Sequence, residues 1–297
     1  MKRMLGLLLV AATAAPATAQ ITLDGTRDAG YGAALAVQTV ETSFGDNQSE
    51  WNAGYGLIDG GNLYLMLTGN LQNNFNKLEI FIDSKAGGQA VFDSSGNDSA
   101  SNMDGLRFDT GFTADYHIIA RRGSSKFDVD FADLGAQTAS GYFDVFGGAD
   151  FGAGATGTGT NVNPLGVSYD GSNVAGVGGN APNAANAAAA LAVTTGLELR
   201  IPLSDLGYVG GPINVMVGQN GGSHDYWSNQ FLGGLQAPSG SLGGDGNGNY
   251  INGPSGINMN NFAGNQYFTV GVPEPASAGI ALLAALGLAA AGRKRQG

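Results

Sequence analysis

The sequence contains no cysteine, which excludes disulfide bonds, cysteine-ligated zinc and a cysteine nucleophile. It has only two histidines, His117 and His224, and neither lies in a His-Glu-x-x-His motif. There is also no Gly-x-Ser-x-Gly elbow for a serine nucleophile. We therefore expect a protein that is not an enzyme. A glycosidase built on two carboxylates stays open as an alternative, and Glu79 and Glu198 are its candidates because each lies within an expected strand.

Basic residues are also scarce. The chain has 13 Lys and Arg against 24 Asp and Glu, a net charge of −11. Five of the basic residues and one acidic residue lie in the two end segments, so residues 20–271 carry 8 basic and 23 acidic residues and a net charge of −15. Nucleic acids and anionic membrane surfaces bind basic patches, so neither is expected as a partner of this region.

The first 19 residues have the pattern of a cleaved signal peptide. Lys2 and Arg3 precede an apolar stretch at residues 4–12, and Ala17, Thr18 and Ala19 form a small-residue cleavage site. We expect a signal peptidase to remove residues 1–19. The mature chain then begins at Gln20 and is exported.

The last 26 residues have the pattern of a second targeting signal. A Pro-Glu-Pro element cannot continue a helix or strand, and an uncharged apolar run at residues 276–292 follows it. In lipid this run can satisfy its backbone groups only as a helix, and the basic end would stay cytoplasmic. The order resembles the PEP-CTERM sorting signal of Gram-negative bacteria that make exopolysaccharide, which implies recognition by an exosortase and removal of residues 272–297. A permanent single-pass anchor is the alternative. The signal residues are Pro273, Glu274, Pro275, Arg293, Lys294 and Arg295.

Between the two signals, residues 20–271 predict one all-β domain. Gly accounts for 51 of the 297 residues and clusters with Asn, Asp and Ser between short β-rich runs. Several runs alternate apolar and polar residues, which is typical of antiparallel sheets. We therefore predict an antiparallel β-sandwich, jelly-roll-like, with long Gly-rich loops. The expected strands are residues 35–40, 63–68, 77–83, 106–110, 114–121, 126–131, 142–146, 197–201, 213–217 and 267–270.

Three long segments do not have a strand pattern: residues 93–105, 147–191 and 233–254. Loops of this length are either functional or disordered. Within the second of them, the Ala-rich residues 184–192 predict either a helix of two turns or an irregular insertion.

Three separated elements of the middle region resemble the family-9-type carbohydrate-binding and DOMON-like β-sandwiches. They are Ile-Thr-Leu-Asp-Gly at residues 21–25 with Asp28 behind it, the pair of runs at 62–65 and 77–83, and Gly-Leu-Glu-Leu-Arg-Ile-Pro-Leu-Ser-Asp-Leu-Gly at 196–207. Tyr31 stands where these families have a tryptophan. The resemblance implies a sandwich fold of a kind that hosts lectin-like binding, haem binding or scaffolding.

Two sets of residues are candidates for ligand binding. Trp51, Tyr226 and Trp227 lie in polar stretches, where an aromatic ring can stack on a sugar; the alternative is that both tryptophans cap the ends of the sandwich core. The second set supplies the oxygen ligands that Ca²⁺ prefers, without the spacing of an EF-hand, and a solvated loop is its alternative. It comprises Asp93, Asn97, Asp98, Asn102 and Asp104.

The sequence thus predicts a structural or adhesive protein of the bacterial cell surface or exopolysaccharide matrix. It would contact the membrane only through its C-terminal tail, before processing, and its partners would be signal peptidase, an exosortase and a polysaccharide. A lectin-like carbohydrate-binding module is the first alternative and an exported glycoside hydrolase is the second. Ca²⁺ is the only candidate cofactor.

Overall fold

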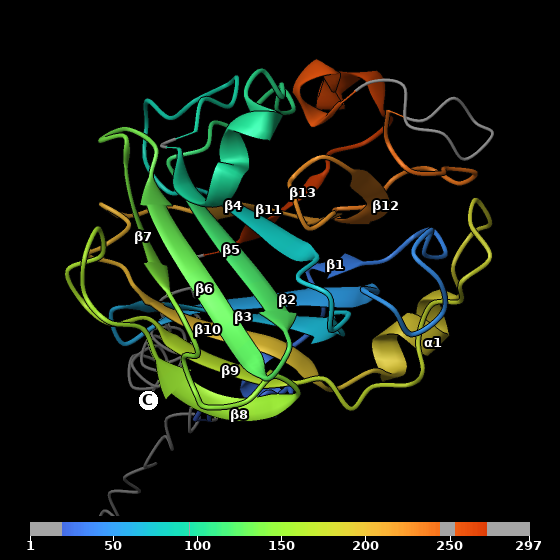
Figure 1. The fold of residues 1–297 in the computed structure, drawn as a ribbon, viewed down its shortest axis with the longest axis horizontal. Coiled ribbons are helices and arrows are strands. Elements are labelled where there is room, and N and C mark those ends of the chain that lie inside the picture. Colours follow the sequence, from blue (N-terminus) through green and yellow to red (C-terminus); the bar gives the residue numbers. More distant parts are fainter. Residues whose placement is uncertain (1–19, 95, 244–252, 272–297) are drawn as a thin grey trace, which may run out of the picture.

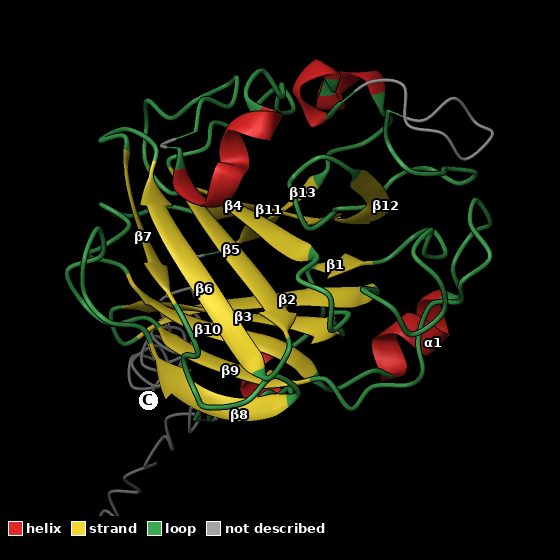
Figure 2. Ribbon diagram, in the orientation of Figure 1, coloured by secondary structure: helices red, strands yellow, loops and turns green. Residues whose placement is uncertain are grey.

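The protein is described by a computed structural model that covers residues 20–94, 96–243 and 253–271. Two antiparallel β-sheets lie face to face with few helical segments, which confirms the predicted all-β sandwich (Figures 1 and 2). The predicted signal peptide and sorting tail lie outside the described residues. Within the described ranges, no helix has the length and apolar character needed to span a membrane.

The first sheet has six strands in the order β1-β2-β3-β10-β9-β8. Its longest hairpin joins β2 to β3 through Gly60 and Gly61, which both have positive φ. A two-residue turn of this kind requires positive φ at both positions, and glycine adopts it at little cost. The strands are β1 (Ala36–Val37), β2 (Trp51–Asp59), β3 (Asn62–Gly69), β8 (Phe151–Ala155), β9 (Gly166–Asp170) and β10 (Gly196–Pro202).

The second sheet has seven strands. Six follow the order β12-β11-β4-β5-β6-β7, and β13 pairs with β11 on the edge that β12 leaves free. The last strand of the described chain therefore shares this edge of the sheet with β12. The strands are β4 (Lys77–Asp83), β5 (Tyr116–Gly123), β6 (Lys126–Asp133), β7 (Thr138–Tyr142), β11 (Ile213–Asn220), β12 (Trp227–Leu232) and β13 (Tyr267–Val270).

The main core fills the space between the sheets. Alternation along each strand sends every second side chain into it, as the sequence predicted for Leu78, Ile80 and Ile82 of β4. On β6 the same rule places Phe127, Val129 and Phe131 in this core. Both predicted faces are confirmed.

The outer face of the seven-stranded sheet is buried as well. A cover made of the segments 84–115 and 233–266, in their described parts, packs a second apolar cluster against it. This cover contains the 3₁₀ helices η2 (Asn97–Met103), η3 (Pro254–Gly256) and η4 (Met259–Asn261), which lie on one side of the sheet in Figure 2. The polar residues that alternate with the core on β4, β5 and β6 are therefore enclosed between the sheet and its cover.

Several strand predictions need correction. Residues 106–110 form no strand, only isolated bridges of Arg107 with Val91 and with Asn258, and residues 143–146 follow the end of β7. The predicted strand at 35–40 shrinks to the two residues of β1. The segment 147–191, expected as a loop, contains β8 and β9, and β2 and β12 were missed altogether. Strand β8 has the sequence Phe-Gly-Ala-Gly-Ala, so it lacks the branched side chains by which a strand is recognised.

The Ala-rich segment forms the only α-helix of the described chain, α1 (Ala187–Ala192). Asn186 caps it, because its side-chain oxygen accepts hydrogen bonds from the backbone N–H groups of Ala188 (3.0 Å) and Ala189 (3.2 Å). This result decides between the two sequence-based alternatives in favour of a helix.

We expect Gly56→Ala to lower the free energy of unfolding by about 1–3 kcal/mol, because overpacking a filled interior forces neighbouring atoms to shift. A Cβ atom at Gly56 would overlap with the side chain of Val270 across the two sheets. Urea denaturation measures the change. Gly240→Ala is the matched control, since no atom lies within 4 Å of the added carbon. Equal stability of both variants would contradict the packing of β13 over β2.

Candidate functional site

The most densely charged region of the described protein lies between the seven-stranded sheet and its cover. On the face of β4, β5 and β6 that points away from the main core, six charged or ionisable side chains are 5% exposed or less: Lys77, Glu79, His117, Arg121, Asp128 and Asp130. The loop between β11 and β12 and the helix η2 supply the remaining members. We call this set the ionic network; it consists of Lys77, Glu79, Asp98, His117, Arg121, Asp128, Asp130 and His224.

Glu79 lies at the centre of the network, with 0% exposure. One carboxylate oxygen pairs with Nε2 of His117 at 2.8 Å, and the other pairs with Nδ1 of His224 at 2.6 Å. Burial on its own would raise the pKa of Glu79, but the charge of His224 and the two hydrogen bonds outweigh burial and hold that pKa well below its usual range. Both oxygens of this carboxylate are therefore engaged by protein groups.

The two histidines that contact Glu79 have opposite protonation behaviour. Burial opposes the charged form of His224, but the adjacent Glu79 and Asp98 dominate and raise its pKa to about 9. Burial dominates at His117 and lowers its pKa, although Glu79 partly offsets the effect. His117 also stacks on Phe81, with ring centroids 4.3 Å apart, which fixes the plane of the ring. At neutral pH the network therefore holds a charged His224 and a neutral His117.

Asp98 connects the cover to the sheet. It lies on η2 with φ of 47°, in the left-handed region that non-glycine residues seldom adopt. Its carboxylate pairs with Lys77 of β4, with Arg121 of β5 at 3.1 Å and with His224 at 3.5 Å. Burial would raise the pKa of Asp98, but these cations outweigh it and lower the pKa to about 2.

Arg121 extends the network towards β6. Its guanidinium pairs with Asp130 and approaches Asp128, with Nε and Oδ2 3.9 Å apart. Positive and negative groups thus alternate from Glu79 through His224, Asp98 and Arg121 to the two aspartates. The arrangement neutralises charges that would be costly to bury singly, and among its members Asp98 is the most exposed, with 26% of its side chain accessible.

The structure does not bring the predicted calcium ligands together. Asp98 is occupied by cations, and Asp104 accepts a hydrogen bond from the backbone N–H of Ser94 at 2.7 Å. Asp93 is exposed at the surface. Within the described ranges, no three His, Asp or Glu side chains are grouped so as to hold a metal ion.

Both tryptophans of the predicted ligand site are buried. Trp51 is 0% exposed, and its indole Nε1 donates to Gln219 at 2.8 Å. Trp227 is also 0% exposed and packs against Phe231 in the outer cluster. Neither indole presents a face to solvent, which corrects the prediction that they stack on a ligand. Tyr226 is half-buried, stacks on Phe44 and donates from its hydroxyl to Ser241 at 2.8 Å.

Glu198 is buried on the opposite side of the sandwich from Glu79. Its carboxylate accepts hydrogen bonds from the backbone N–H groups of Asp24 (2.9 Å) and Gly25 (2.8 Å) and from the hydroxyl of Tyr31 (3.0 Å). Burial raises the pKa of Glu198, and these bonds offset it only in part. Glu198 fixes the N-terminal segment to the six-stranded sheet. Because the main core separates the two glutamates, they do not form the carboxylate pair of a glycosidase.

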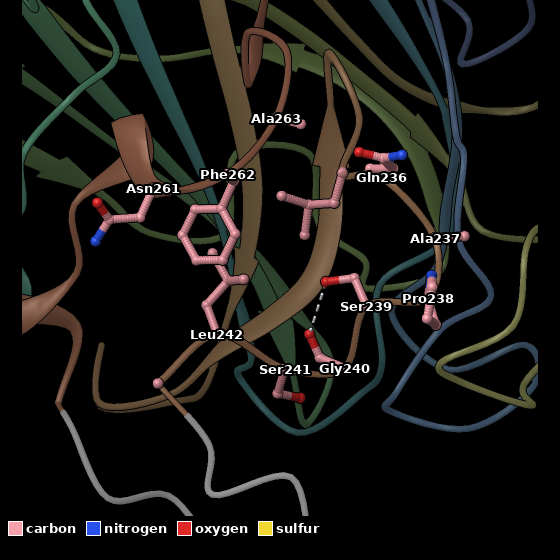
Figure 3. Close-up of a pocket in the computed structure, with 12 residues that line it drawn as sticks. Gln236, Ala237, Pro238, Ser239, Gly240, Ser241, Leu242, Asn261, Phe262 and Ala263 are labelled. Carbon is pink, nitrogen blue, oxygen red and sulfur yellow. Dashed lines mark hydrogen bonds between the residues drawn. The ribbon is translucent and has the colours of Figure 1, made fainter.

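Two open hollows lie outside the ionic network, on the cover. The larger has a volume of about 800 Å³ and is formed by residues 235–243 and 261–263 (Figure 3). The smaller, of about 390 Å³, lies beside Arg107, Asp109 and Asn260. Neither includes a residue of the ionic network, so the charged groups and the open surfaces are separate.

Sequence reasoning missed the ionic network as a site, although a signal for it was present. Charged or polar residues occupy alternate positions of three consecutive strands: 77 and 79, then 117 and 121, then 128 and 130. Antiparallel pairing brings these positions to one face of the sheet, and β5 and β6 are joined by a tight hairpin. The contributions of Asp98 and His224 have no such signal, because they come from loops distant in sequence.

Comparison with protein-family models, with curated proteins and with solved structures found no match to this chain. Its function is therefore inferred from its own residues.

We expect Glu79→Gln to lower the free energy of unfolding by about 3–5 kcal/mol, because it leaves the charge of His224 buried with its main partner removed. Urea denaturation followed by circular dichroism measures the loss. Asp93→Asn makes the same chemical change on an exposed aspartate and should alter stability by less than about 0.5 kcal/mol. A loss below about 1 kcal/mol for Glu79→Gln would show that the network contributes little to stability.

Stability should also fall at alkaline pH. The pKa of His224 is about 9 in the folded protein against 6.5 as its ordinary value, so its charged form favours folding. This contribution is complete below about pH 6.5 and is lost as the pH rises through 9. Thermal unfolding midpoints between pH 6 and 10 measure the decline. In His224→Gln the decline should be shallower, and identical pH profiles would contradict the assignment.

Proposed function

We propose that the protein is an exported, non-catalytic structural or adhesive component of the bacterial cell surface or exopolysaccharide matrix. In this proposal residues 1–19 are a signal peptide, and residues 272–297 form an apolar helix and basic end that an exosortase recognises and removes. The domain between them is a jelly-roll-like sandwich of the carbohydrate-binding and DOMON-like kind. The protein contacts the inner membrane only before this processing.

The observation that supports a non-catalytic role is the closure of the ionic network. Glu79, His117 and His224 are the groups best suited to acid–base chemistry, and each is 2% exposed or less. A general acid or base has to come within hydrogen-bond reach of its substrate. Here the partners of these groups are one another and Asp98, so they serve to fasten the cover to the sheet.

The interactions that stabilise the folded chain are compatible with a location outside the cytoplasm. It has no cysteine, so nothing in it depends on the redox state of its surroundings. The acidic excess favours solubility and repels anionic surfaces. Buried ion pairs and two apolar clusters provide the cohesion that disulfides provide in many exported domains.

A carbohydrate-binding role is the second candidate. The larger hollow favours it, because about 800 Å³ lies within the roughly 300–1,000 Å³ typical of small-molecule sites, and its lining is neutral. Binding of this kind is compatible with the matrix role, since a matrix protein that holds polysaccharide is adhesive.

The sorting signal can be tested with a triple alanine substitution at Pro273, Glu274 and Pro275. In an exopolysaccharide-producing Gram-negative host we expect the wild-type chain in the surface and matrix fractions, lacking residues 272–297 by intact mass. The variant should accumulate in the inner membrane with its tail attached, because the processing enzyme no longer recognises it. Immunoblotting of cell fractions measures the distribution.

A Glu41→Ala variant serves as the control, since it removes one acidic residue outside the sorting signal. Identical fractionation of wild type and triple variant, with the tail retained in both, would contradict processing. A deletion strain whose matrix cohesion is unchanged would contradict the structural role. Release of reducing sugars from matrix polysaccharide by the purified protein would instead establish the hydrolase alternative.

A further inference from the structure

The larger hollow has the features of a preformed binding site. One wall is the segment 235–243 that follows β12, and the other is the segment 261–263 that follows η4 (Figure 3). In Figure 3 Phe262 stands on one side of the hollow, and Pro238, Ser239 and Gly240 stand on the other. The two walls are separate segments of the cover, and the hollow opens between them.

Hydrogen bonds from behind hold the first wall along its length. Thr39 bonds to both backbone groups of Leu235, donating to its carbonyl at 2.6 Å and accepting from its N–H at 3.0 Å. Asn229 donates to the carbonyl of Ser239 at 2.8 Å, and the N–H of Leu242 donates to the carbonyl of Trp227 at 3.1 Å. The wall is therefore ordered without a ligand, which lowers the ordering cost of binding.

The tyrosine predicted to bind a ligand supports the same wall from the inside. The hydroxyl of Tyr226 donates to Ser241, and Ser241 donates to Ser43, both at 2.8 Å. Ser241 lines the hollow, so Tyr226 is hydrogen-bonded directly to a lining residue. Tyr226 itself is not among the residues that line the hollow.

The second wall presents an aromatic ring. Phe262 is half-buried and packs partly against the outer apolar cluster, and it also lines the hollow. Gln266, just beyond this wall, is buried and donates from its side-chain amide to the carbonyls of Ala263 (3.3 Å) and Gly234 (3.2 Å). A single amide therefore ties the two walls together at their base.

Among the residues that the structure describes, the lining contains no ionisable side chain. The chain as a whole has 24 acidic residues against 13 basic ones, so a neutral lining differs from its overall charge. The polar groups that line the hollow are amides and hydroxyls, with Gln236 and Asn261 exposed at its rim. Such groups both donate and accept hydrogen bonds but cannot neutralise a charged ligand.

We propose that this hollow binds a neutral glycan. The ring of Phe262 lies against the apolar face of one sugar residue, and Gln236, Ser239 and Asn261 exchange hydrogen bonds with its hydroxyl groups. Sugars combine an apolar face with a rim of hydroxyls, which matches a ring set among neutral polar groups. An acidic glycan is disfavoured, because the negative protein surface repels it and the lining has no cation to receive it.

The smaller hollow fits this ligand less well. Its lining includes Arg107 and the buried Asp109, and Asn260 is already engaged with Thr110 and with the carbonyl of Phe108. With about 390 Å³ it has half the volume of the larger hollow. We therefore do not propose the smaller hollow as a second glycan site.

The test is isothermal calorimetry of the 20–271 domain, expressed within the full chain and purified after export. The neutral probes are maltoheptaose, cellohexaose and dextran, and the acidic probes are alginate and polygalacturonate. We expect saturable binding of at least one neutral probe and none of the acidic ones. Phe262→Ala should weaken that binding about tenfold or more, because it removes the apolar surface under the sugar.

Phe143→Ala is the matched control, since Phe143 is 68% exposed and lies outside the hollow, and it should bind as wild type does. Ser239→Tyr is a second variant that fills the hollow while leaving Phe262 in place, and it should abolish binding. Circular dichroism checks that each variant is folded. Failure of all neutral probes to bind, stronger binding of acidic probes, or unchanged binding in folded Phe262→Ala and Ser239→Tyr would overturn the proposal.

The neutral-glycan site rests on the proposed matrix role, because that role would bring the protein into contact with polysaccharide. Different experiments test the site and the role, so either proposal can be refuted without the other. Loss of glycan binding with normal export and surface display would refute the neutral-glycan site alone. Identical fractionation of the wild type and the triple sorting-signal variant, with the tail retained in both, would refute the proposed processing and leave calorimetric binding unaffected.

Discussion

The ion pairs of Asp98 fasten the outer cover to the seven-stranded sheet, and much of the remaining structure follows from this attachment. A carboxylate removed from water costs several kcal/mol unless cations compensate it. Asp98 meets this requirement with Lys77, Arg121 and His224, which come from three different parts of the chain. Removing the cover would therefore expose the outer apolar cluster and leave three cations without their shared partner.

The loop between β11 and β12 links the ionic network to the larger hollow. His224 in this loop is held by Glu79, and two residues later Tyr226 is bonded to Ser241 in the wall of the hollow. Asn220 fixes the path between them by accepting hydrogen bonds from the N–H groups of Gly221 and Tyr226. The position of one wall of the hollow thus depends on charges buried beneath the cover.

Most of the basic side chains of the described residues are engaged in contacts within the protein, and this affects the charge of its surface. Lys77, Arg121 and Arg122 form ion pairs, and Arg27 and Lys85 lie over the rings of Tyr55 and Tyr116. Few positive charges are left to balance the exposed carboxylates. The outside is consequently acidic, and a neutral hollow on it is chemically distinct from its surroundings.

The sequence by itself determined the all-β class and the inner faces of β4 and β6, because alternation is a local property of each strand. It also placed the polar residues of β4, β5 and β6 on the face opposite the core. Whether that face meets water was decided only by the tertiary structure, in which the cover encloses it. The decisive contacts join residues distant in the chain, such as Glu79 and His224, 145 positions apart. Contacts across such distances leave no local pattern, so only folding brought these charges together, buried the two tryptophans and opened the hollow beside Phe262.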